Sequence, residues 1–93
     1  MTYSLFGDGE YLTDVATISG WSSYADWIEK THDPSSELVR FVEHGCSDRP
    51  RELARELAKV RPRQKNLLAI HEAFEQAVAQ VGDDVMVVLS DGT

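Results

Sequence analysis

The chain has 93 residues, 42% of them hydrophobic, and a formal net charge of −7. This length predicts a single compact domain over residues 1–93, and the hydrophobic content excludes a disordered chain. The excess of acid argues against general DNA coating, which relies on neutralising phosphates.

The beginning of the chain is typical of a β-hairpin. Residues 3–6 and 10–12 read as two strands around the turn-forming Gly7, Asp8 and Gly9. Residues 13–19 remain open, because their β-branched side chains also allow the second strand to continue. Thr13 as N-cap and Gly20 as a stop predict a short helix instead, and we favour the helix.

Four further helices are predicted from caps and apolar spacing. Ser22 caps the first, over residues 22–31. Asp33 and Pro34 start the second, and Gly45 ends it. Ser47 caps the third, which ends before Pro62 and turns Leu53, Leu57 and Val60 toward the core. The fourth covers residues 63–81 up to Gly82, with one apolar stripe formed by Leu67, Ile70, Phe74, Ala77, Val78 and Val81.

The last apolar segment, residues 85–89, is continuously apolar and β-branched, which is typical of a strand covered on both faces. The N-terminal hairpin is the only sheet that it can join. The fold class predicted is therefore α+β, with four or five amphipathic helices and a small antiparallel sheet formed by the N-terminal hairpin and the C-terminal strand.

Charge is sorted along the chain into three blocks. Residues 1–48 carry nine acids and two bases, residues 49–65 seven bases and two acids, and residues 66–93 five acids and no base. The basic block is predicted to form a ridge on the third helix, continued beyond its end. The candidate partner-binding residues are Arg51, Arg55, Lys59, Arg63 and Lys65.

This ridge has a plain interpretation and two functional ones. It is either a solvated helix face neutralised by Glu52 and Glu56, or a docking surface for an acidic protein or a second copy of the chain. Nucleic acid binding through the basic helix 49–65 is the alternative, although no aromatic residue interleaves with the bases. A helix-turn-helix over residues 15–28 is disfavoured, because its second helix would place Asp26 and Glu29 in the groove.

The acidic side chains also allow mimicry of nucleic acid, with excess acid serving solubility as the plain alternative. The carboxylates concerned are Asp8, Glu10, Asp14, Asp26, Glu29, Asp33, Glu37 and Glu43.

A small metal-dependent or hydrolytic enzyme is the remaining alternative, and its signals are weak. His71 and Glu75 lie one helical turn apart, and His32 or His44 would have to complete a metal site. Hydrolysis would require His44, Cys46 and His71 to converge. The chain has no two-histidine zinc motif, glycine-rich phosphate loop or nucleophile motif. We therefore predict no catalytic residue, no metal and no cofactor, and a buried or half-buried Cys46.

Trp21, Tyr24 and Trp27 are predicted to belong to the core, with a binding surface as the alternative. No apolar run approaches the roughly 20 residues of a membrane span, no signal peptide is visible, and the single cysteine has no internal partner. The resulting hypothesis is a small acidic, non-enzymatic protein-binding module in the cytoplasm, acting as a regulator, inhibitor or adaptor.

Overall fold

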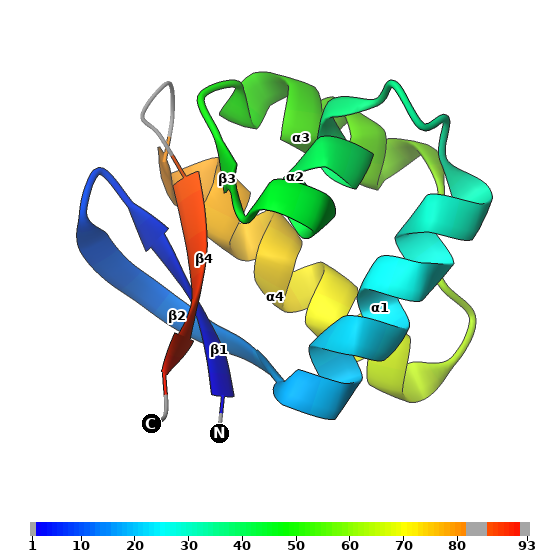
Figure 1. Cartoon of the computed structure of the whole chain (residues 1–93), viewed down its shortest axis with the longest axis horizontal. Coiled ribbons are helices and arrows are strands. Elements are labelled where there is room, and N and C mark those ends of the chain that lie inside the picture. Colours follow the sequence, from blue (N-terminus) through cyan, green and yellow to red (C-terminus); the bar gives the residue numbers. More distant parts are fainter. Residues whose placement is uncertain (1, 82–85, 92–93) are drawn as a thin grey trace.

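The computed structural model describes residues 2–81 and, as backbone, residues 86–91. Helices pack together on one side of an antiparallel sheet whose strand order is β2-β1-β4-β3 (Figure 1). The α+β class is thereby confirmed. The elements are β1 (Thr2–Gly7), β2 (Glu10–Thr17), α1 (Ile18–Thr31), α2 (Glu37–His44), β3 (Cys46–Ser47), α3 (Pro50–Lys59), α4 (Lys65–Val81) and β4 (Met86–Asp91).

The predicted hairpin is confirmed as β1 and β2, and its turn explains the local sequence. Asp8 and Gly9 both have positive φ, 53° and 79°, as the favoured two-residue hairpin turn requires. The ladder then continues as far as the pairing of Thr2 with Thr17.

The helix favoured over residues 13–19 is wrong up to Thr17. Successive side chains here point to opposite faces, as they do in a strand. Val15 enters the core, while the neighbouring Asp14 accepts a hydrogen bond from Ser4 on β1 at 2.8 Å. Thr17 is the N-cap of α1, and its Oγ1 accepts from the Gly20 N–H at 3.1 Å. Gly20 therefore lies in the first helical turn and does not end a helix.

The continuity of α1 also contradicts a helix-turn-helix over residues 15–28. Val15 lies in a strand, and Gly20 lies inside one uninterrupted helix that begins at Ile18. No turn separates two helices in that segment, so there is no recognition helix to enter a groove.

The start of the second helix was predicted three residues too early. The Asp33 carboxylate accepts from both the N–H and the hydroxyl of Ser35, which forms a side-chain-capped turn. Ser36 is the N-cap, and its Oγ accepts from the Val39 N–H at 3.2 Å. The predicted end is confirmed, since Gly45 takes the left-handed conformation with φ 84° and donates to the Phe41 carbonyl.

Ser47 does not cap α3 directly but supports its entry. Its hydroxyl accepts from the Arg49 N–H at 3.0 Å and donates to Glu37 at 2.6 Å, and Pro50 is the first helical residue. Leu53 and Leu57 are fully buried as predicted. Val60 is not a core residue, because α3 ends at Lys59 and Val60 is 36% exposed.

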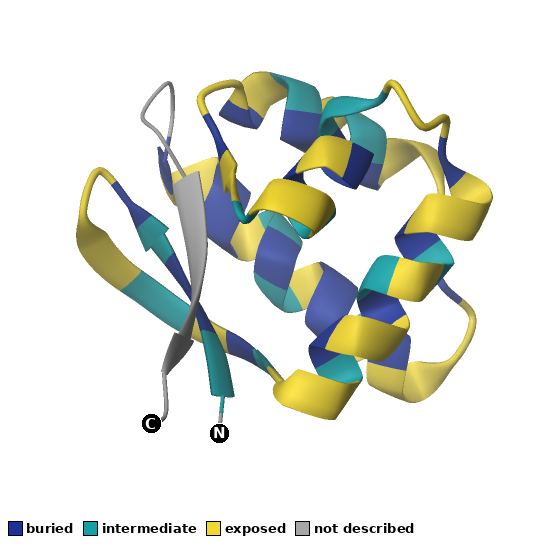
Figure 2. Ribbon diagram, in the orientation of Figure 1, coloured by how far each residue is buried: buried dark blue, intermediate teal, exposed yellow. Residues whose placement is uncertain are grey.

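Helix α4 spans the molecule and supplies the largest share of the core (Figures 1 and 2). Its predicted stripe is confirmed in full: Leu67, Ile70, Phe74, Ala77, Val78 and Val81 are all buried. The predicted stop at Gly82 and the start of the last apolar segment at Val85 lie outside the described residues. Among the described helices, none has the length and apolar character needed to cross a membrane.

Candidate functional site

The basic block forms an exposed surface over α3, the following loop and the start of α4. Arg51, Arg55 and Lys59 lie on α3, Arg63 lies in the loop, and Lys65 begins α4. The side chains of all seven bases between residues 49 and 65 are solvent-exposed: Arg49, Arg51, Arg55, Lys59, Arg61, Arg63 and Lys65. The structure thus gathers the five predicted docking residues on neighbouring elements.

These bases differ in how far they are compensated within the molecule. Arg55 pairs with Glu52 at 3.0 Å, Lys59 with Glu56 at 2.9 Å, and Arg61 with Glu75 at 2.9 Å. Arg63 and Lys65 form no ion pair with any residue that the structure describes. The bases left for an external partner therefore include Arg63 and Lys65. They lie at the loop end of this surface, which is the loop after α3 and the start of α4, beyond the predicted ridge on α3.

Two adjoining hollows open at this loop end, and Trp27 lies between them. One, of about 330 Å³, is lined by Trp27, Val60, Arg61, Arg63, Gln64 and Leu67. The other, of about 260 Å³, shares Trp27, Gln64 and Leu67 and adds Ser23, Asp26 and Lys30. Sequence reasoning missed these hollows, because residue 27 meets residues 60–67 only through the packing of α1 beside α4. We call the first one the Trp27 hollow.

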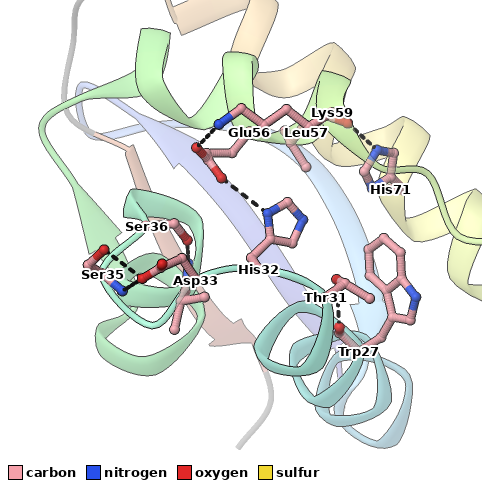
Figure 3. Close-up of polar contacts among 11 residues, drawn as sticks. Trp27, Thr31, His32, Asp33, Ser35, Ser36, Glu56, Leu57, Lys59 and His71 are labelled. Atoms are coloured by element: carbon pink, nitrogen blue, oxygen red, sulfur yellow. Dashed lines mark hydrogen bonds and ion pairs between the residues drawn. The ribbon is translucent and has the colours of Figure 1, made fainter.

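The Trp27 ring is fixed on its inner side by other rings. It stacks on Tyr24 with centroids 5.8 Å apart and an interplanar angle of 26°. It also meets His32 and His71 edge-on, at 6.2 and 6.0 Å (Figure 3). Trp21 and Tyr24 are core residues as predicted, whereas Trp27 is only partly buried and keeps one side toward the hollow.

Beneath Trp27, His71 closes a buried hydrogen-bond chain. Its Nε2 lies 2.9 Å from the Leu57 carbonyl, which can only accept, so Nε2 carries the proton. In the neutral ring Nδ1 then accepts from the Tyr24 hydroxyl at 2.8 Å. Burial lowers the pKa of His71 and raises the pKa of Tyr24, which keeps both groups neutral. With both ring nitrogens used, His71 is a structural residue.

This burial predicts a loss of stability in acid. Burial makes the pKa of His71 lower in the fold than its ordinary value of 6.5. The hydrogen bond to the Leu57 carbonyl and the charge of Glu75 oppose this effect, and Arg61 and His32 add to it. The unfolded chain therefore binds more protons below pH 6.5, and the His71 contribution to the free energy of unfolding decreases as pH falls from there.

Chemical denaturation at a series of pH values measures this dependence. His71→Gln removes the titrating ring but keeps an amide, so it should flatten this part of the profile. An NMR titration that places the pKa of His71 above 6.5 would contradict the assignment.

A second buried histidine joins the end of α1 to α3. His32 Nδ1 lies 3.1 Å from Glu56 Oε2, and Lys59 binds the other oxygen of the same carboxylate at 2.9 Å (Figure 3). The hydrogen bond from Lys59, followed by that from His32, lowers the pKa of Glu56 against the opposing effect of burial. This cluster fixes α3 relative to the end of α1 and so positions the basic surface.

A separate hollow of about 480 Å³ tests the enzymatic alternative. Its lining is Glu37, Arg40, His44, Cys46, Ser47 and Asp48. The prediction of a buried or half-buried Cys46 is wrong, because the two-residue strand β3 leaves this side chain exposed. His44 and Cys46 share the hollow, but His71 is not part of it. Within the described residues, no three histidine, cysteine or acidic side chains are arranged to hold a metal ion.

No protein-family model, curated protein or solved structure matches the chain.

Proposed function

We propose that the protein is a non-enzymatic binding module that docks an acidic segment of another protein on its basic surface. The observation that carries this proposal is that all seven bases between residues 49 and 65 are exposed, along α3, the loop after it and the start of α4, in a molecule whose net charge is −7. A regulator, inhibitor or adaptor in the cytoplasm fits this role.

Charge favours a different protein over a second copy of this chain. Each copy carries a net charge of −7, so two copies repel one another at long range. An acidic segment on a partner can instead approach the basic surface locally. Complementary charge of this kind acts mainly on the rate of association and on specificity.

The uncompensated bases identify the residues on which binding should depend most. Arg55 and Lys59 already have carboxylate partners on α3, whereas Arg63 and Lys65 have none among the described residues. A partner carboxylate near Arg63 or Lys65 therefore has no internal ion pair to displace.

The test is titration of the protein with a short synthetic peptide of alternating aspartate and glutamate, followed by NMR and repeated at high salt. We expect the shifts to concentrate at residues 59–65 and to weaken with salt. Arg63→Gln with Lys65→Gln should weaken binding several-fold, and Arg40→Gln, an exposed base on α2, is the matched control.

Three outcomes would reject the proposal. They are absence of binding, equal loss in the Arg40→Gln control, and tighter binding to duplex DNA than to the peptide. Sedimentation of the protein alone at low and high salt tests the second-copy alternative in the same samples.

The predicted ridge has its own test, with a different expected result. Replacing Arg51, Arg55 and Lys59 by glutamine should change the free energy of unfolding little, because exposed ion pairs contribute about 0–1 kcal/mol each. If the ridge also docks the partner, the triple variant should keep its fold and associate more slowly with the acidic peptide, most clearly at low salt. Unfolding measurements and binding kinetics on the same variant separate the two effects.

A further inference from the structure

The Trp27 hollow combines an apolar floor with an uncompensated base, a pairing found at the centre of many protein interfaces. Trp27, Val60 and Leu67 supply the apolar surface, and Arg61 and Arg63 flank it. Val60 contributes the most exposed apolar side chain of this hollow, since it is 36% exposed just after the end of α3.

The size of the hollow limits what it can hold. About 330 Å³ lies at the lower end of the roughly 300–1,000 Å³ typical of ligand pockets, and the hollow is open on its outer side. This space suits one apolar side chain of a protein segment. The second hollow continues past Trp27 along α1, so a segment of extended chain has room to run on in that direction.

The hollow is also held in shape before any partner arrives. Trp27 is stacked on Tyr24 and contacts His71, whose two ring nitrogens are both hydrogen-bonded. A ring fixed in this way loses little conformational freedom on binding, which favours affinity.

From these features we infer that the Trp27 hollow receives one aromatic or large aliphatic side chain from an acidic partner segment whose carboxylates bind Arg63 and its basic neighbours. This inference rests on the proposed function and adds to it the chemical class of the partner. The segment is acidic because Arg63 has no ion pair among the described residues, and it carries an apolar anchor because the floor is apolar.

Two synthetic peptides test the anchor. Both consist of aspartate and glutamate, and one has phenylalanine at its centre where the other has serine. Burial of the phenyl ring should make the first bind about tenfold more tightly. In NMR spectra of the ¹⁵N-labelled protein, the indole signal of Trp27 should shift with that peptide and the signal of buried Trp21 should not.

Matched variants distinguish binding of the phenylalanine in the hollow from non-specific apolar binding elsewhere on the protein. Val60→Ser should remove most of the advantage of the phenylalanine peptide while leaving the serine peptide unaffected. Ile18→Ser is the control, because Ile18 is 37% exposed at the start of α1 and lines a different hollow. Thermal melting confirms that both variants fold.

The remaining outcomes distinguish failure of the anchor site from failure of the proposed function. Equal binding of the two peptides would overturn the anchor site and leave the proposed function standing. Failure of both peptides to bind would overturn the proposed function as well. A Trp27 signal that shifts with protein concentration alone would show that a second copy of this chain occupies the hollow, and would also overturn the inference.

Discussion

Phe74→Ala is expected to reduce the free energy of unfolding by about 3–5 kcal/mol. Phe74 lies fully buried on α4, and its ring centroid is 5.2 Å from that of Phe41 and 5.9 Å from that of Trp21. Removing the ring leaves a cavity among aromatic side chains that cannot collapse easily. The loss is large beside the roughly 5–15 kcal/mol typical of a whole domain.

Chemical denaturation followed by fluorescence measures this loss. Glu72→Ala, an exposed substitution on the same helix, is the control and should change the value by no more than about 0.5 kcal/mol. A loss below about 1 kcal/mol for Phe74→Ala would contradict the burial of its ring.

Ending the chain after Asp83 is expected to leave the protein unfolded or insoluble. Strand β1 pairs on one edge with β2 and on the other with β4, from Thr2 opposite Asp91 to Gly7 opposite Met86. Without β4, this second edge of β1 is unpaired, and β3 also loses the strand it pairs with. A lone two-stranded hairpin is only marginally stable in water.

Circular dichroism and thermal melting measure whether the chain that ends after Asp83 still folds. A chain ending after Asp91 keeps all of β4 and should melt like the full sequence. Unchanged melting of the shorter variant would show that the sheet does not depend on its C-terminal strand, contrary to our sequence prediction.

Much of the helical part of this fold could be predicted, because its signals are local. The stripe of α4 repeats at helical spacing from Leu67 to Val81. Gly45 marks the end of α2 because it takes the left-handed conformation, which glycine adopts more easily than other residues. The error at residues 13–19 arose where two local signals compete. Thr13 and Thr17 are both acceptable N-caps, and only the pairing with β1 selects Thr17.

The candidate site was predicted in its charge but not in its shape. The clustering of bases in residues 49–65 is visible in the sequence itself, so Arg63 and Lys65 could be proposed as candidates from it. The Trp27 hollow needs two segments more than 30 residues apart to meet, and its most exposed apolar residue, Val60, was assigned to the core by helical spacing. That spacing fails because α3 ends one residue earlier.

The pairing of β1 with β4 has a kinetic consequence. It joins residues 2–7 to residues 86–91, which are nearly the whole sequence apart, and these two strands lie in the middle of the sheet (Figure 1). Contacts of such long sequence separation slow folding, because the loop between them must close first. During synthesis, α1 to α3 can leave the ribosome and begin to pack, while one edge of β1 stays unpaired until the last strand emerges.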